Sequence, residues 1–252
     1  MPVKHLSLVP FLLAPAIAGT LYSGDFSSSL RPFSACNLKS PSTVTASDGY
    51  AKFYFDESDY DGTRDDKGVE ICVFEDGTST NAAQMSKEGW QGFDLYVPSG
   101  SFPTDRSTII AQQFCPGGCS SWCGGLQIIN SSLVAEYRAA CGDATSVTLV
   151  DDIERDTWHS VVVHMRVSQE EGGAYEVWWD STQVHGANDI NVGFGTWDGD
   201  ALSTGWYFKN GIYAYDTEDY SDGTTRTLQF DKVRWYETDS GEADGYDTVA
   251  SE

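Results

Sequence analysis

Hydrophobic and polar residues alternate along most of this chain with the two-residue period of β-strands. Clusters of Gly, Pro, Asn, Asp and Ser bound the alternating segments. These segments are residues 50–56, 69–74, 92–97, 108–114, 158–168, 175–180, 206–215 and 228–236. Long helical patterns are nearly absent. Many strands without helices between them predict an all-β fold, namely a β-jelly roll or concanavalin-like sandwich of two antiparallel sheets.

The polar faces of three strands carry the side chains that a sugar-binding groove needs, because successive side chains on a strand point to opposite faces. In residues 206–215 this face carries Tyr207, Lys209, Tyr213 and Tyr215.

Two other strands add amide, imidazole and guanidinium groups. His164 and Arg166 share a polar face in residues 158–168, and Gln112 shares a face with Ile110 and Phe114. If all these faces lie on one concave sheet, they form a substrate groove with hydrogen-bond donors, cations for carboxylates and aromatic platforms for sugar rings. The alternative is a solvent-facing sheet whose polar face binds nothing.

The first residues predict export from the cell. A short apolar run ends at Ala16-Ile17-Ala18, which has the form of a signal-peptidase site. The run is too short to span a bilayer, so residues 1–18 are predicted to be a signal peptide. Residues 19–238 then form the jelly-roll domain, and residues 239–252 form an acidic tail that we expect to be poorly ordered.

Six cysteines follow the signal peptide, and an even number in a secreted chain predicts disulfides. They are Cys36, Cys72, Cys115, Cys119, Cys123 and Cys141, of which the last four are expected to staple one long loop. Zinc binding is the alternative, although the C-x3-C-x3-C spacing is not a usual zinc motif. Asn130 begins an N-x-S sequon, which predicts glycosylation.

The formal net charge is −23. Nucleic acid and anionic membranes are therefore poor partners, because like charges repel them from such a surface. We expect a secreted, extracellular monomer.

Residues 205–213, which read G-W-Y-F-K-N-G-I-Y, resemble the Y-F-K-A-G-x-Y strand of the alginate lyases of polysaccharide lyase family 7. Residues 89–98 look like their W-x-G-F-x-x-Y-x-P strand, and residues 109–114 look like their I-I-x-Q-x-H strand. Residues 158–164 and 175–180 are similar to the paired strands that follow. The chain most resembles the fungal glucuronan lyases of family 20, which share this jelly roll.

The resemblance implies β-elimination on a uronic-acid polymer, without a catalytic cofactor. Such a reaction needs a group that neutralises the carboxylate next to the C5 proton, a base for that proton and an acid for the leaving oxygen. By position, Gln112 would bind the carboxylate, and Tyr213 would be the base, the acid or both. Lys209 would bind a carboxylate or lower the pKa of the tyrosine.

The alternation adds His164 as a further proton-handling candidate. It also adds substrate-binding candidates, which are Arg166, Tyr207, Tyr215 and Tyr96. The family histidine is not visible, since Phe114 stands in its place. Cys72 stands where a basic residue or histidine would help.

The strand at residues 228–236 resembles the last strand of many carbohydrate-active jelly rolls. Its Asp231 is predicted to join Asp25 around a structural Ca2+, since calcium prefers oxygen ligands. A solvent-exposed aspartate is the alternative.

Two other functions remain open from the sequence. One is a non-catalytic carbohydrate-binding jelly roll, which needs only the aromatic row. The other is a glycoside hydrolase, which needs two carboxylates about 5 to 10 Å apart. Glu70 and Asp94 are possible partners only if they share the cleft.

Overall fold

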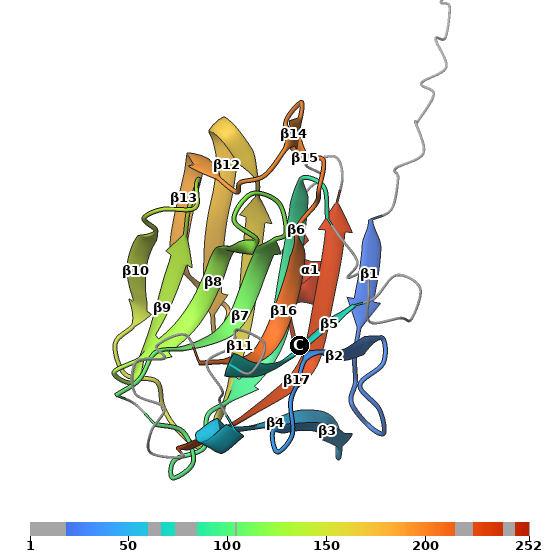
Figure 1. Cartoon of the computed structure of the whole chain (residues 1–252), viewed down its shortest axis with the longest axis vertical. Helices are drawn as coiled ribbons and strands as arrows, with labels where there is room; N and C mark the ends of the chain where they lie inside the picture. Colours follow the sequence, from blue (N-terminus) through green and yellow to red (C-terminus); the bar gives the residue numbers. More distant parts are fainter. Residues whose placement is uncertain are drawn as a thin grey trace, which may run out of the picture.

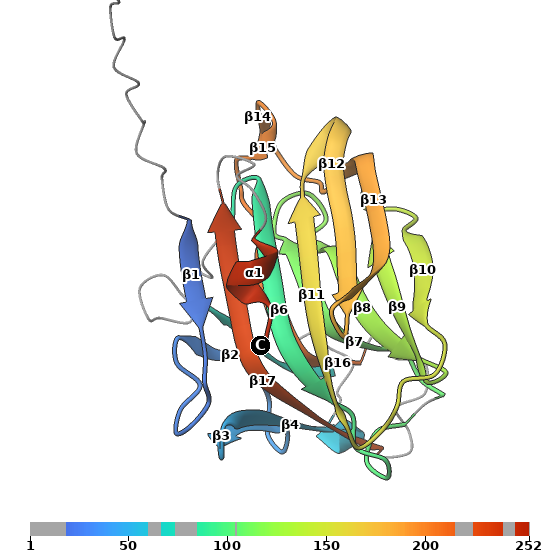
Figure 2. The same cartoon turned by 180° about the vertical axis from the view of Figure 1, so that it is seen from behind.

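The computed structural model describes residues 19–59, 67–73, 85–103, 105–214, 224–238 and 245–251. Two large antiparallel sheets pack face to face, as Figures 1 and 2 show from opposite sides. This arrangement confirms the predicted all-β sandwich. The predicted signal peptide and Tyr215 lie outside the described residues.

The eight-stranded sheet forms the face in front in Figure 2. Its strands are β1 (Thr20–Ser23), β3 (Thr43–Ser47), β4 (Tyr50–Asp56), β6 (Glu88–Tyr96), β11 (Trp158–Arg166), β12 (Ser168–Trp179), β13 (Thr182–Val192) and β17 (Thr225–Thr238). They follow the order β13-β12-β11-β6-β17-β4-β3, with β1 paired to β17.

The seven-stranded sheet forms the face in front in Figure 1. Its strands are β2 (Phe33–Asn37), β5 (Gly68–Val73), β7 (Thr108–Cys115), β8 (Ser121–Ile129), β9 (Ser132–Tyr137), β10 (Thr145–Val150) and β16 (Tyr207–Tyr213). They follow the order β10-β9-β8-β7-β16-β5-β2. The remaining elements are β14 (Trp197–Asp198), β15 (Ala201–Leu202), the 3-10 helix η1 (Glu57–Asp59) and the helix α1 (Tyr246–Val249).

The core between the sheets is apolar and rich in aromatic rings. Phe53, Phe93, Phe208 and Phe230 are buried in it, and Trp235 packs against Phe208 with ring centroids 5.9 Å apart. These residues alternate with outward-facing ones along their strands, which is why the two-residue period was visible in the sequence.

A hydrogen-bonded amide network crosses this core. Gln91 of β6 donates to Asn210 Oδ1 of β16 at 2.8 Å and accepts from Gln113 Nε2 of β7 at 2.9 Å. Trp235 Nε1 also donates to Asn210 Oδ1 at 3.0 Å, and the Tyr175 hydroxyl donates to Gln113 Oε1 at 2.9 Å. The network therefore fixes β7 and β16 of one sheet relative to β6 of the other.

Three disulfides join the six cysteines, which confirms that prediction. Cys115–Cys123 and Cys119–Cys141 lie within the segment from β7 to the start of β10, as expected for the loop cysteines. Cys36–Cys72 joins β2 to β5.

The chain end differs from the poorly ordered tail that the sequence predicts, at least over residues 245–251. In this stretch α1 lies on the outer face of the eight-stranded sheet, where Val249 packs against Trp90 and Val162 (Figure 2). The glycine at position 92 allows this approach, because a Cβ there would lie 2.0 Å from the Val249 carbonyl oxygen. An acidic composition did not reveal the few apolar residues that anchor the segment. Among the described residues, no helix is long and apolar enough to cross a membrane.

Replacing Gln91 with alanine should lower the free energy of unfolding by about 3 kcal/mol, because Gln113 and Asn210 each lose a buried partner. Denaturant unfolding followed by tryptophan fluorescence measures this loss. Gln183→Ala, at an exposed site on β13, is the matched control and should change stability by less than about 0.5 kcal/mol. Equal losses in the two variants would contradict the role given to the network.

Candidate active site

A pocket of about 260 Å³ opens on the outer face of the seven-stranded sheet. Its lining residues come from β2, β7, β16 and the loop after β7; they are Cys36, Asn37, Gln112, Phe114, Ser120, Tyr207, Lys209 and Tyr213. Four side chains that the sequence predicted for a substrate groove are thus brought together: Gln112, Lys209, Tyr213 and Tyr207.

Alternation along β7 and β16 places these side chains outward. Gln113 and Asn210 point into the core amide network, so their neighbours Gln112 and Lys209 point to the outer face. The pairing register sets these two residues directly opposite one another.

Irregular pairing beside the pocket changes the simple alternation. The register between β7 and β8 shifts between Ile109 and Ala111, and Ile110 packs in the core. The expectation that Ile110 shares a face with Gln112 is therefore wrong, because the irregularity interrupts the two-residue period. The register between β16 and β7 shifts between Asn210 and Tyr213, beside Gly211, whose φ of 147° favours glycine.

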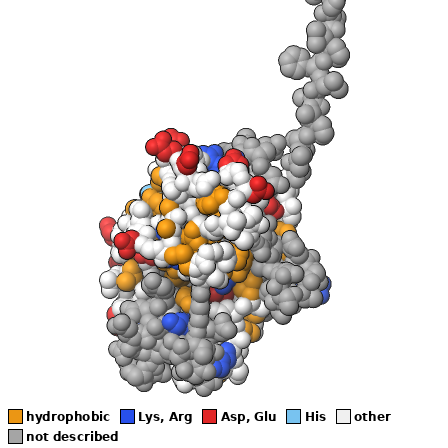
Figure 3. Space-filling model, turned by 45° about the horizontal axis from the view of Figure 1, so that its top comes forward, with side chains coloured by type: hydrophobic (Ala, Val, Ile, Leu, Met, Phe, Trp, Pro, Cys, Tyr) orange, Lys and Arg blue, Asp and Glu red, His pale blue; other side chains and the backbone are white. Residues whose placement is uncertain are grey.

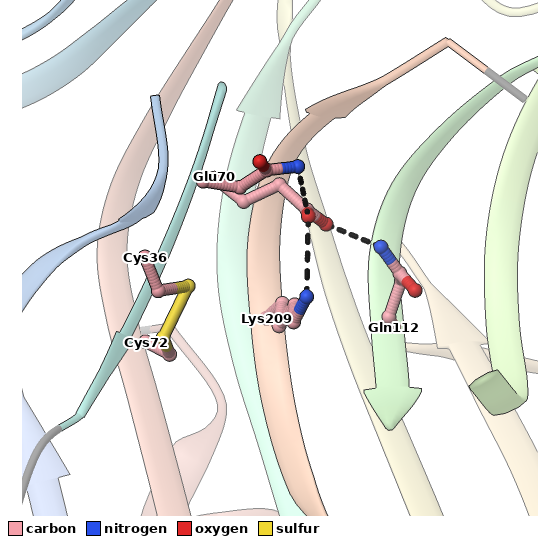
Figure 4. Close-up of a disulfide and its surroundings, with 6 residues drawn as sticks. Cys36, Glu70, Cys72, Gln112 and Lys209 are labelled. Atoms are coloured by element: carbon pink, nitrogen blue, oxygen red, sulfur yellow. Dashed lines mark hydrogen bonds and ion pairs between the residues drawn. A yellow bond between two sulfur atoms is a disulfide. The ribbon is translucent and has the colours of Figure 1, made fainter. Parts of the chain in front are cut away.

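A buried carboxylate organises the polar side of the pocket (Figure 4). Glu70 of β5 is 2% exposed, and it accepts a short hydrogen bond from Gln112 Nε2. Lys209 Nζ lies 3.4 Å from Glu70 Oε2, and Asn37 Nδ2 donates to the same oxygen at 3.3 Å. A buried charge must be paired and hydrogen-bonded, and these three donors meet that need.

Aromatic rings flank the lysine. Lys209 Nζ lies 4.4 Å from the ring centroid of Phe114 and 6.0 Å from that of Tyr207. A cation over a ring face is attracted by the ring quadrupole, so the rings help to hold the ammonium beside Glu70. Phe114, at the position that the resemblance assigns to a histidine, has no group that can take up or release a proton.

Sequence reasoning missed two contributors to this cluster. Glu70 was considered only as half of a hydrolase pair, although its outward position on an alternating strand was a usable signal. Asn37 gave no signal, because it reaches Glu70 only through the pairing of β2 with β5, which the Cys36–Cys72 disulfide reinforces.

The structure does not bring His164 to the pocket. His164 lies on β11 of the eight-stranded sheet, where it contacts Glu176 at 2.8 Å and Glu88 at 2.6 Å and stacks on Trp90 at 4.0 Å. The prediction that it faces the groove is wrong, because β11 pairs with β6 and β12 rather than with a strand of the pocket sheet.

The prediction that Arg166 and Tyr96 line the groove is also wrong, because their strands, β11 and β6, belong to the eight-stranded sheet. Arg166 follows His164 on β11, and its Nε donates to the Gly172 carbonyl at 2.7 Å. Tyr96 ends β6, and its hydroxyl donates to Asp156 at 3.4 Å. Neither residue lies on the sheet that carries Gln112.

The expected calcium site does not fit the described residues. Burial and then the charges of Asp94 and Asp25 raise the pKa of Asp231. Lys232 Nζ lies 3.3 Å from Asp94. No group of three or more His, Cys, Asp or Glu in the described part of the chain is arranged to hold a metal, and calcium takes six to eight oxygen ligands.

The fold is that of a β-jelly roll, and its pocket brings together an amide, an ammonium and a phenol. The profile of the polysaccharide lyase family matches residues 42–234, which include β5, β7 and β16, and the chain belongs to this family. It is therefore a polysaccharide lyase.

Solved structures show the same fold at low identity. An endo-β-1,4-glucuronan lyase from the fungus Trichoderma reesei has a TM-score of 0.62 and 19% identity, covering 88% of this chain and 96% of its own. An alginate lyase from Pseudomonas aeruginosa has a TM-score of 0.55 and 16% identity, covering 80% and 88%. No curated protein sequence matches the chain significantly.

His164 and its two carboxylate partners on the eight-stranded sheet are expected to make a pH-dependent contribution to the stability of the fold. Burial opposes the charge of His164, but hydrogen bonds and charge from Glu176 and Glu88 outweigh it and raise its pKa. A raised pKa stabilises the fold below the unfolded value of about 6.5, and this contribution is lost as the pH rises through the folded value.

The difference in unfolding free energy between wild type and His164→Gln should therefore shrink as the pH rises from about 5.5 to 9. Denaturant unfolding across this range measures it. His185→Gln is the control with the opposite sign, since burial lowers the pKa of His185. If the difference in unfolding free energy between wild type and His164→Gln instead grew with pH, the prediction would be contradicted, because the fold would then favour the neutral imidazole.

Proposed function

We propose that this enzyme cleaves a uronic-acid polymer of the glucuronan type by β-elimination, in the pocket on the seven-stranded sheet. The observation that carries the proposal is that Gln112, Lys209 and Tyr213 line one pocket. The solved relatives act on glucuronan and alginate by their names, and both substrates are polyuronates.

The amide and ammonium groups supply the electrostatic part of the reaction. Removal of the C5 proton places a second negative charge on the sugar, so donors must already be aimed at the sugar carboxylate. Gln112 keeps one amide N–H and Lys209 keeps further N–H donors beyond those that contact Glu70. In this proposal Glu70 orients both donors and does not touch the sugar.

Tyr213 supplies the proton transfer. A phenol that has lost its proton takes the C5 proton, and the resulting hydroxyl protonates the leaving glycosidic oxygen. Electrons from the broken C5–H bond form the C4=C5 double bond as the C4–O bond breaks. With Phe114 at the histidine position and His164 on the other sheet, Tyr213 performs both transfers.

A glycoside hydrolase is less consistent with the geometry. Glu70 and Asp94 lie on different sheets, and Asp94 pairs with Lys232. Glu136, which also faces outward on the pocket sheet, is four strands from Glu70. Four strand spacings are about 19 Å, which exceeds the roughly 5 to 10 Å that hydrolysis requires.

We also propose that the enzyme is secreted, with residues 1–18 as its signal peptide. Three disulfides support an oxidising compartment. Asn130 is exposed in the turn between β8 and β9, with φ values of 50° at Asn130 and 66° at Ser131. This position suits the attachment of a glycan, which remains a prediction.

Incubation with glucuronan, alginate and a neutral glucan separates the possible activities. Elimination produces a C4=C5 double bond that absorbs in the near ultraviolet, together with new reducing ends. New reducing ends without absorbance would indicate a hydrolase. Retained binding without either signal would leave a carbohydrate-binding protein.

Replacing Tyr213 with phenylalanine should lower kcat by about 10²–10⁴-fold, because the proton-transfer group is removed. Replacing Gln112 with alanine should lower kcat by about 10²–10³-fold through loss of a donor to the intermediate. Initial rates of ultraviolet absorbance on glucuronan measure both effects. Tyr236→Phe, on the other sheet, is the matched control and should keep wild-type activity. Full activity in Tyr213→Phe would remove that residue from the mechanism.

A further inference from the structure

A second carboxylate faces the same surface as the pocket, on the side away from Glu70. Glu136 lies on β9 between Ala135 and Tyr137, which both pack in the core. Strand alternation therefore turns Glu136 to the outer face. The pairing register sets Gln112 opposite Gly125, and Gly125 opposite Glu136, so the three residues form one row across β7, β8 and β9.

The middle of this row has no side chain. A Cβ built on Gly125 would meet only the Ala111 carbonyl oxygen at 3.2 Å and Ile109 Cγ2 at 3.8 Å. The floor between Gln112 and Glu136 is thus low enough for a sugar ring to lie on it. Two strand spacings, about 10 Å, separate the backbones of these residues.

Burial and the neighbouring groups act in opposite directions on the charge of Glu136. Burial raises the pKa of Glu136 above its usual value, and hydrogen bonds from the side chains of Ser146 and Gln127 and the charge of Arg138 offset only part of that rise. Arg138 itself lies 4.0 Å from the ring centroid of Trp122, and its Nε donates to the Trp122 carbonyl at 2.7 Å. An ionised carboxylate only accepts hydrogen bonds, so it binds hydroxyl groups and repels another carboxylate.

The charges described on this face leave no surplus of cations beside Glu136. Lys209 is paired with Glu70, and Arg138 is the basic residue whose charge acts on Glu136. Figure 3 shows acidic side chains, with a basic one beside them, at the upper edge of the molecule, and hydrophobic side chains over the middle of the visible face. Binding of a polysaccharide that has a carboxylate on every sugar along this row is therefore disfavoured.

We propose that Glu136 forms a subsite next to the reacting uronate that binds a sugar through its hydroxyl groups and rejects a carboxylate at that position. This narrows the proposed substrate class: a polymer in which the cleaved uronic acid has an uncharged neighbour is preferred over glucuronan itself, in which every sugar carries a carboxylate. This inference rests on the proposed elimination at Gln112 and Tyr213, and it adds the residue that selects the neighbouring sugar.

The test compares two polymers, glucuronan and glucuronan whose carboxylates have been partly reduced to alcohols. For the wild type, kcat/KM per remaining uronate should be higher on the reduced polymer. Glu136→Gln should raise kcat/KM on unmodified glucuronan about tenfold at low salt and remove the preference, because a close like-charge contact is lost. The gain should shrink with added salt, which screens the repulsion.

Glu170→Gln is the matched control, since it removes the same charge from an exposed site on β12 of the other sheet. It should leave the ratio of the two kcat/KM values unchanged. An unchanged ratio in Glu136→Gln, or a lower kcat/KM on both polymers, would overturn the subsite. If the wild type forms no unsaturated product from either polymer, the elimination proposal fails. In that case the ratio of the dissociation constants for the two polymers, compared between wild type and Glu136→Gln, tests the role of Glu136 separately.

Discussion

The amide network of Gln91, Gln113 and Asn210 is the constraint on which the pocket depends. It pairs the amides of Gln91 and Gln113 and the Asn210 Oδ1 atom inside an apolar core, where an unpaired amide costs about 1–3 kcal/mol. Because it holds Gln113 and Asn210 inward, the residues before them, Gln112 and Lys209, must face outward on adjacent strands. The inter-sheet contact therefore decides which side chains meet on the outer surface.

The pocket is built around a buried carboxylate. Glu70 contacts donors from β2, β7 and β16, and in the proposed mechanism Gln112 and Lys209 also meet the sugar carboxylate. A carboxylate behind the donors lowers the net positive charge of the site. The proposed mechanism fits an acidic protein of net charge −23, because it uses a few aimed donors rather than a broad basic surface.

Much of the fold was predictable from local patterns. The period of two identified five strands of the eight-stranded sheet and three of the seven-stranded sheet. The even number of cysteines behind a predicted export signal indicated disulfides. The motif in residues 205–213 located Lys209 and Tyr213, because adjacent residues on one strand keep their spacing in any fold. His164, Arg166 and Tyr96 were assigned to the pocket incorrectly, because alternation tells which residues share a face but not which sheet the strand joins.

By itself, the sequence determined the fold class, the presence of disulfides and the chemical groups available on each strand, since these follow from composition and short-range spacing. The tertiary structure alone decided that β11 lies on the opposite sheet, that irregular pairing beside Ala111 turns Ile110 into the core, and that Asn37 reaches Glu70. It also aligned Glu136 with Gln112 across Gly125. All four depend on pairing between residues distant in the chain, which long-range burial and strand register set together.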